Sequence, residues 1–340
     1  MPRPGRLLDS VLALMLKIGF FDVVRYCMPP VLTVLCYHRV EDPLRSDFNL
    51  FRPNVSASPL EFARQMDYVR RHYSVITCEH LLSWLRGEKD LPRHPLVITF
   101  DDGYSDNLAF AYPILKERNL PAIIFLTTGF IGGDLPFYWD YVAYLFSHTQ
   151  QISARLPITG EAAWTTAAER EKVMISWVDC VKKLPEAERR QAVSEIAAVL
   201  DVRVPERVFS NLYLTWEQIR MMDQNNIEFG AHTVNHPILT RISRDGVQEE
   251  VNKSKQQIEN EIQRPISTFA YPNGQRSDFS DEVISIVREA GIEIAFTLLP
   301  GPTQIKVVRE NPLAIRRIFL SHSDSFPRFV AKLFGLSYWL

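Results

Sequence analysis

Short apolar runs alternate with amphipathic segments along most of the 340-residue chain. Eight runs rich in Val, Ile, Leu and Phe are predicted to be strands, at 31–37, 73–78, 96–100, 122–127, 227–231, 266–271, 292–298 and 314–320. They are nearly continuous rather than alternating, which is typical of strands covered on both faces. Helices are predicted after Ser58, Thr215 and Ser243 and over 105–119. This order predicts an α/β fold with about seven to eight parallel strands, closed as a barrel or open and doubly wound.

The interval from 128 to 226 breaks this rhythm, because it contains no convincing strand. Apolar residues at helical spacing predict one helix through Trp177 and a second helix after Pro185. We therefore expect a helical insertion at about 136–213, on a loop that follows a strand. Such loops often carry the function of α/β folds.

Residues 1–30 are predicted to form a separate amphipathic helical segment, and the main domain is expected over 31–335. Apolar positions such as Leu7, Val11 and Ile18 repeat at helical spacing, which is typical of a helix that docks on the protein. The alternative is peripheral contact with a membrane through residues 7–24. The apolar run is too short to span a bilayer, and no small-residue cleavage site follows it.

Charge and cysteine content limit the partners and the compartment. The chain has 38 Lys and Arg against 40 Asp and Glu, so a formal net charge of −2 gives no electrostatic basis for binding nucleic acid. The four cysteines form no C-x-x-C pair and are expected to be free thiols. That usage is typical of a reducing compartment, so we expect a cytoplasmic protein, with membrane association as the alternative.

Two adjacent carboxylates, Asp101 and Asp102, follow the apolar residues 96–98 directly. Unpaired buried charges are costly, so these are not ordinary core residues. The carboxyl ends of parallel strands are where barrel folds keep their sites. The alternative is local: Asp102 and Gly103 make a turn, and Asp101 caps the following helix.

Two histidines, His232 and His236, follow the strand predicted at 227–231. Their spacing lets one tight loop aim both imidazoles at one point, although two surface loop histidines are the alternative. Two imidazoles and one carboxylate are a common ligand set for a catalytic zinc with an open position. Asp102, His232 and His236 are therefore predicted to bind Zn²⁺ or another divalent transition metal, with Asp101 as the base that deprotonates water.

These motifs resemble the signature of the polysaccharide deacetylases of carbohydrate esterase family 4, the NodB-homology fold. The family pattern T-F-D-D-G, followed by H-[ST]-x-x-H, is matched by residues 99–103 and by His232, Thr233 and His236. The resemblance implies a distorted (β/α) barrel, a catalytic base at Asp101 and metal ligands at Asp102, His232 and His236.

The activity that this resemblance implies is hydrolysis of carbon–nitrogen bonds. A metal-dependent deacetylase would remove acetyl groups from N-acetylhexosamine units of a poly- or oligosaccharide and release acetate. One alternative is an O-acetyl esterase or another small-amide hydrolase with the same site. A second alternative is a catalytically degenerate protein that only binds glycans.

The family's third motif, R-x-P-x-G, is matched only in part, by Ala270-Tyr271-Pro272-Asn273-Gly274. Ala270 replaces the arginine that normally holds the base, and Arg316 or Arg317 is a candidate substitute. Asn273 is expected to offer its backbone N–H to the oxyanion. Tyr271 and Pro272 are expected to line the substrate site.

Two histidines are candidates for the acid that protonates the leaving nitrogen. His322 lies in a late L-x-H pattern, whereas His38 lies in an early Y-H pattern that resembles a branch of the family with permuted strand order. We prefer His38. In the insertion, Tyr138, Trp139 and Asp140 are candidates for contacts with the sugar, although Trp139 could instead pack the insertion.

Overall fold

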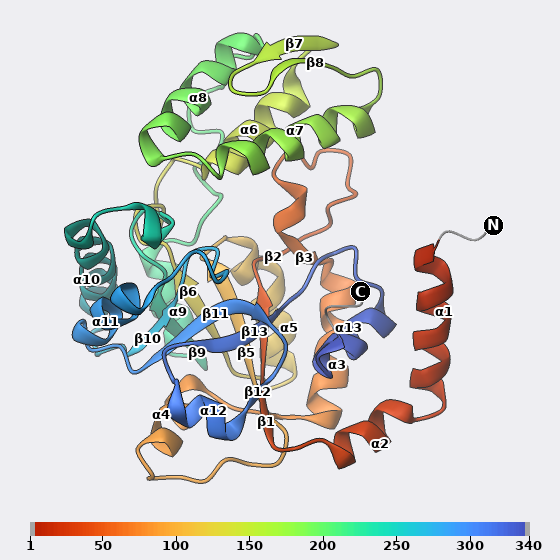
Figure 1. The fold of residues 1–340 in the computed structure, drawn as a ribbon, viewed down its shortest axis with the longest axis vertical. Coiled ribbons are helices and arrows are strands. Elements are labelled where there is room, and N and C mark those ends of the chain that lie inside the picture. The colour runs from red at the N-terminus through yellow and green to blue at the C-terminus, as the bar shows by residue number, and fades with distance from the viewer. Residues whose placement is uncertain (1–3, 337–340) are drawn as a thin grey trace. The chain divides into compact units, whose positions relative to one another are not determined.

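Seven parallel strands close into a barrel in the computed structural model, which describes residues 4–336, with side chains from residue 7 onward (Figure 1). Their order around the barrel is β1 (Val31–Tyr37), β13 (Ile315–Phe319), β11 (Ile294–Pro300), β10 (Thr268–Ala270), β9 (Ile227–Ala231), β6 (Ala122–Leu126) and β5 (Pro95–Asp102). The parallel pairing of β5 with β1 closes the ring. This confirms the distorted (β/α) barrel and rules out the open sheet.

The predicted run at 73–78 contributes only the short strand β4 (Ser74–Val75), which pairs with β5 outside the closed ring. A second short strand, β12 (Thr303–Gln304), runs antiparallel to β1. The strand register then places the candidate site. Asp101 and Asp102 pair with Phe125 and Leu126 at the carboxyl end of β6, and Leu126 pairs with Ala231, the residue before His232.

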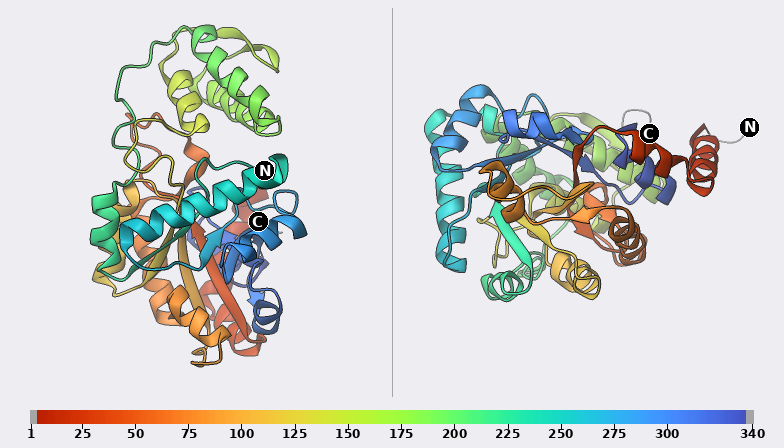
Figure 2. Two further views of the ribbon diagram at one scale, coloured as in Figure 1. Left: turned by 90° about the vertical axis from the view of Figure 1, so that its left-hand side faces the viewer. Right: turned by 90° about the horizontal axis from the view of Figure 1, so that it is seen from below.

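Helices surround the strands of this barrel (Figure 2). They are α3 (Pro59–His72), α4 (Cys78–Leu85), η2 (Asn107–Ala111) with α5 (Tyr112–Glu117), α9 (Trp216–Asp223), α10 (Arg244–Ile262), α11 (Asp281–Glu289), α12 (Ile305–Glu310) and α13 (Phe326–Leu333). Ser58, Thr215 and Ser243 cap α3, α9 and α10 as predicted, each accepting a hydrogen bond from a backbone N–H of the first turn.

Short elements fill the loops: the two-stranded parallel pair β2 (Arg39–Val40) and β3 (Val55–Ala57), and the turns η1 (Arg52–Asn54) and η3 (Leu239–Arg241). The N-terminal segment forms α1 (Pro4–Lys17) and α2 (Phe20–Cys27). Within residues 4–336, no helix is both long enough and apolar enough to cross a bilayer.

One face of the N-terminal helices packs against α13 and the residues beside it. The Asp9 carboxylate of α1 accepts hydrogen bonds from Arg328 at 2.6 Å and from Ser325 at 2.8 Å, both in or beside α13. The buried Phe21 of α2 packs against Phe334, with ring centroids 5.1 Å apart.

Contacts divide the chain into two compact units. The barrel unit spans 1–42, 53–131 and 213–340, and the second unit spans 43–52 and 132–212. The second unit contains α6 (Tyr138–His148), α7 (Ala167–Val181) and α8 (Glu186–Val199). Residues 43–52 join it through an ion pair of 2.7 Å between Arg52 and Glu171.

The second unit also contains an antiparallel hairpin, β7 (Ser153–Leu156) and β8 (Gly160–Ala163), so the expectation of no strand in this interval is wrong. Its strands have four residues each and alternate between more and less exposed positions, which hides them from a search for continuous apolar runs. Trp177 is buried beneath the hairpin turn, where its indole N–H donates to the Pro157 carbonyl at 2.9 Å. It is therefore a core residue of this unit.

Candidate metal centre and acid–base site

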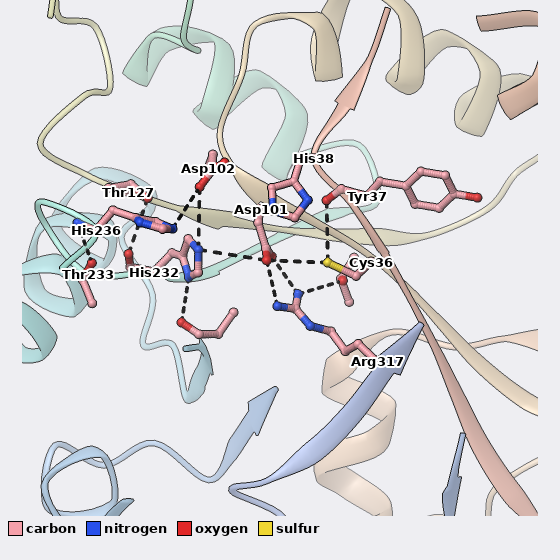
Figure 3. A network of polar contacts seen from close by, with 12 residues as sticks. Cys36, Tyr37, His38, Asp101, Asp102, Thr127, His232, Thr233, His236 and Arg317 are labelled. Carbon is pink, nitrogen blue, oxygen red and sulfur yellow. Dashed lines mark hydrogen bonds and ion pairs between the residues drawn. The ribbon is translucent and has the colours of Figure 1, made fainter. Parts of the chain in front are cut away.

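The neighbouring carboxylates of Asp101 and Asp102, at the end of β5, point in different directions. Asp101 and Asp102 are each only 1% exposed. Asp102 has a φ of 78° and Gly103 has the same value, so the backbone turns into the left-handed region as the strand ends. As Figure 3 shows, Asp101 faces Arg317, and Asp102 faces the two histidines.

Asp102, His232 and His236 form a cluster of possible metal ligands (Figure 3). Asp102 Oδ1 lies 3.7 Å from His232 Nε2 and 3.6 Å from His236 Nε2. In a tetrahedral zinc site with bonds of about 2.0–2.1 Å, ligand atoms lie roughly 3.3 Å apart. The separations here are slightly wider, so small side-chain movements would let all three ligand atoms bind one ion.

The surroundings of His232 favour the tautomer that binds a metal. Its Nδ1 lies 2.7 Å from the carbonyl oxygen of Ala270, which can only accept a hydrogen bond. The proton therefore belongs on Nδ1, and Nε2 faces Asp102 with its lone pair. Burial lowers the pKa of His232, which keeps the imidazole neutral as metal binding requires.

The loop that carries the histidines is held in an unusual conformation. Thr233 and His236 have φ values of 68° and 57°, a region that β-branched residues such as threonine rarely adopt. The hydroxyl of Thr233 accepts from the His236 N–H at 3.0 Å. The Glu250 carboxylate of α10 accepts from the backbone N–H groups of Val234 and Asn235, both at 2.8 Å. Backbone strain is thus held by specific contacts at the candidate ligands.

Arg317 of β13 supplies the cation that is absent at Ala270. Its two terminal nitrogens donate to the two oxygens of Asp101, each at 2.7 Å, and its Nε donates to the Thr297 carbonyl at 2.9 Å. Burial opposes ionisation of Asp101, but Arg317 outweighs it and holds the pKa of Asp101 well below its usual range. Of the two candidates, Arg316 is exposed, because neighbouring strand residues face opposite sides.

His38 lies beside Asp101. Its ring nitrogen, an oxygen of Asp101 and the sulfur of Cys36 all lie within 4.8 Å of one another. The His38 ring packs edge-on against Phe319 at 5.5 Å. His322 follows β13, and its backbone N–H donates to the Val55 carbonyl of β3 at 2.9 Å. His38 thus lies beside the predicted base, and its role as the acid stays a prediction.

The loop after β10 has a tight turn at the expected oxyanion position. Asn273 and Gly274 have φ values of 58° and 60°. A Cβ at Gly274 would lie 2.6 Å from the backbone nitrogen of Leu298, so only glycine fits this close approach. The role of the Asn273 N–H, on a half-buried residue beside the buried Pro272, stays a prediction.

The Tyr271 side chain does not line an open site, which corrects that expectation. The residue is 0% exposed, and its hydroxyl donates to the Leu313 carbonyl at 3.0 Å. Its ring stacks on Phe279, with centroids 4.9 Å apart. Because this side chain is enclosed by protein, it supports the loop rather than meeting a glycan.

The aromatic and acidic candidates of the second unit are internal to that unit. Asp140 is 0% exposed and accepts from the Phe51 N–H at 3.0 Å. The buried Trp139 stacks on Phe137, with centroids 4.4 Å apart. These contacts favour a structural role for Asp140 and Trp139 over the predicted contact with the sugar. A contact through the half-buried Tyr138 stays a prediction.

Comparison with known proteins identifies the family of this chain. The family model described as polysaccharide deacetylase matches residues 88–295. YxkH of Bacillus subtilis (strain 168), which is assigned as a polysaccharide deacetylase, is 22% identical over 274 residues, covering 80% of this chain and 66% of its own. The poly-beta-1,6-N-acetyl-D-glucosamine N-deacetylase of Staphylococcus epidermidis is 31% identical over 106 residues, 29% of this chain and 36% of its own.

A solved structure shares the fold. The Streptococcus pyogenes deacetylase PplD aligns with a TM-score of 0.58 at 18% identity, over 90% of this chain and 99% of that one. Because the family match covers more than half of the sequence, the chain belongs to the polysaccharide deacetylase family, whose members are hydrolases acting on carbon–nitrogen bonds. The predicted family is thus confirmed, and the permuted branch stays a prediction.

Proposed function

We propose that this protein is a metal-dependent N-deacetylase that removes acetyl groups from N-acetylhexosamine units of a glycan. The observation that carries the proposal is the meeting of Asp102, His232 and His236 beside the ion-paired Asp101. The Staphylococcus epidermidis relative, named for N-deacetylation of poly-beta-1,6-N-acetyl-D-glucosamine, supports this choice of substrate class.

The donor set of Asp102, His232 and His236 fits Zn²⁺, because two imidazole nitrogens and a carboxylate are common ligands of catalytic zinc. When bound, the metal supplies a Lewis acid for the acetamido carbonyl and lowers the pKa of a water molecule. Another divalent transition metal that accepts the same ligands is the alternative.

The residues of this chain divide the proton transfers between them. The ionised Asp101 accepts a proton from the attacking water, and Arg317 holds its carboxylate in one orientation. The backbone N–H of Asn273 donates to the developing oxyanion. His38 gives a proton to the leaving nitrogen, so the products are acetate and a free amino sugar.

Two alternatives differ in what they predict. An O-acetyl esterase would use the same residues on an ester, whose leaving group needs less help from the acid. A degenerate glycan-binding protein was suggested by the loss of the motif arginine at Ala270. The loss of that arginine no longer argues for a degenerate protein, because Arg317 makes a bidentate ion pair with the proposed base, Asp101.

Acetate release tests the proposed function. Metal-free protein would be incubated with Zn²⁺ and either a chitin oligosaccharide or a β-1,6-linked N-acetylglucosamine oligomer. We expect acetate and free amine in equal amounts, loss of both after chelation, and recovery when zinc is added back. Glycan binding that survives chelation without any acetate release would favour the degenerate protein. Release from an O-acetylated glycan alone would favour the esterase.

We also propose that the exposed face of α1 and α2 contacts a lipid surface. Leu7 and Leu14 of α1 are 63% and 59% exposed and share one face of the helix. Ile18, directly after α1, is 69% exposed, and Val23 of α2 is 64% exposed. The wild-type protein should co-sediment with vesicles of anionic phospholipid, whereas the L14E variant should stay in the supernatant. Equal sedimentation of both would contradict this contact.

A further inference from the structure

A buried polar cluster joins the loops that follow β1 and β5. The Arg39 Nε donates to Asp106 Oδ2 at 2.7 Å, and the backbone N–H of Val40 donates to Asp106 Oδ1 at 2.9 Å. The guanidinium of Arg39 also lies over the ring of Tyr104, 4.8 Å from its centroid. Arg39 and Asp106 are each 3% exposed, so water does not weaken this contact.

The two joined loops carry different parts of the proposed chemistry. His38 lies between β1 and β2, directly before Arg39. Asp101 and Asp102 end β5, and Asp106 follows four residues later. The cluster therefore fixes the acid's loop to the loop that carries the base and a metal ligand.

Buried side chains hold both backbone polar groups of His38. Asn107 Nδ2 donates to the His38 carbonyl at 2.9 Å, and the His38 N–H donates to Ser56 Oγ at 2.9 Å. Asn107 is 1% exposed and Ser56 is 0% exposed. Asn107 Nδ2 also lies 3.2 Å from Asp106 Oδ1, so Asn107 connects His38 to the ion pair.

We propose that Asn107 is a positioning residue for the His38 imidazole, and that the Arg39–Asp106 pair locks the two loops together. This inference rests on the proposed function, because it takes His38 as the acid. Its physical basis is that a proton donor must lie within hydrogen-bond distance of the leaving atom, so a displacement of about 1 Å lowers the rate strongly. Releasing the His38 carbonyl would allow such a displacement.

Asn107→Leu is a suitable variant because leucine keeps the branched shape at Cγ and carries no hydrogen-bonding atom, although its side chain is larger. It removes the donor to His38 and also removes Asn107 Oδ1, which has no hydrogen-bond partner among the described residues. Removing that buried oxygen offsets part of the cost of the lost hydrogen bonds. If this variant does not fold, Ser56→Ala removes the other contact to the His38 backbone with a smaller change.

The test compares two substrates with different leaving groups. An amide requires protonation of its leaving amine, whereas 4-nitrophenyl acetate releases a stable phenolate without an acid. Asn107→Leu should lower kcat for the N-acetylated oligosaccharide by about 10- to 100-fold, a part of the roughly 10²–10⁴-fold that general acid–base catalysis contributes. KM, zinc affinity and the rate with 4-nitrophenyl acetate should stay within about threefold of wild type.

Two further variants complete the test. His38→Ala should show the same selective loss on the amide, and the double variant should lose little more than His38→Ala alone. Asn225→Leu, which changes an exposed asparagine that donates to Met221, is the matched control and should cleave both substrates normally.

Equal losses on amide and ester in Asn107→Leu, or additive losses in the double variant, would overturn the positioning role. A wild type that releases no acetate from the N-acetylated oligosaccharide would instead overturn the proposed function, whatever its rate with 4-nitrophenyl acetate. The two failures are therefore distinguishable.

Discussion

The barrel unit and the second unit each bury carboxylates almost completely, yet they use them differently. In the second unit, Asp140 accepts a backbone N–H from Phe51, which joins residues 43–52 to α6. In the barrel unit, Asp102 faces His232 and His236, which lie in the loop after a different strand, β9. A buried carboxylate alone therefore does not mark a site. Ionisable side chains from a distant element, gathered around it, do.

The aromatic residues of the second unit teach the same lesson. Trp139 and Trp177 are conspicuous in the sequence, but the structure buries both. Trp177 directs its N–H to a backbone carbonyl, and Trp139 stacks on Phe137. Their large apolar surfaces form part of the core of this unit, together with buried residues such as Leu145 and Phe146.

The largest difference in activity is expected between two Asp→Asn variants, one in each unit. Asp101→Asn should lower kcat for acetate release by roughly 10³-fold, since it removes the general base, and should leave zinc bound. Asp140→Asn should keep kcat within a few-fold of wild type. Steady-state assays and metal analysis of both purified proteins would check this. Normal turnover in Asp101→Asn would exclude that residue as the base.

His236→Ala sharpens the assignment of the metal ligands. Loss of a residue that only hydrogen-bonds to a metal ligand typically lowers metal affinity by roughly 10–100-fold. Loss of the ligand His236 itself should lower the zinc affinity by more than that. Competition with a chromophoric chelator would measure the affinity. His148→Ala, a matched change in the second unit, should bind zinc as wild type does. An unchanged affinity in His236→Ala would break the proposed cluster.

Arg317→Met tests the buried ion pair with Asp101. Removing one partner leaves a buried charge uncompensated, so the free energy of unfolding should fall by about 3–5 kcal/mol. Denaturant unfolding would measure this loss, and kcat should fall as well because the base loses its orientation. Arg316→Met, one residue away on the exposed side of β13, should change the stability little. Equal effects of the two variants would contradict the role given to Arg317.

The smallest expected effect concerns the start of α7 in the second unit. Hydrogen bonds from Thr165 and Thr166 lower the pKa of the exposed Glu169 to about 2. Because the folded-state pKa lies below the unfolded value, this contribution to stability is present above about pH 4.5 and is lost as the pH falls toward 2. The Tm difference between wild type and Glu169→Gln should therefore shrink between pH 6 and pH 3. A constant difference would contradict this cap, and kcat should not change at pH 7.

The sequence predicts the barrel strands well because their apolar runs are continuous and buried on both faces. The sequence also predicts the cluster of candidate metal ligands, since Asp102 and the pair His232 and His236 each follow such a run. It could not place Arg317 opposite Asp101 with certainty, because that pair joins residues 216 positions apart in the chain. Only the closure of the barrel between β1, β5 and β13 brings them together.

Other contacts leave no local signal in the sequence. Asp106 and Asn107 read only as the start of a helix, although their side chains hold the loop of His38. The Tyr271 side chain reads as a site residue because of its motif, although it packs inside the protein. The hairpin β7–β8 was missed because its strands are short and partly exposed.

The most direct test of the account is a crystal structure of the protein with Zn²⁺, with data collected at the zinc absorption edge. One anomalous peak should lie within about 2.0–2.2 Å of a carboxylate oxygen of Asp102 and of the Nε2 atoms of His232 and His236. Zinc bound elsewhere, or a site that any of these three side chains does not reach, would contradict the central claim.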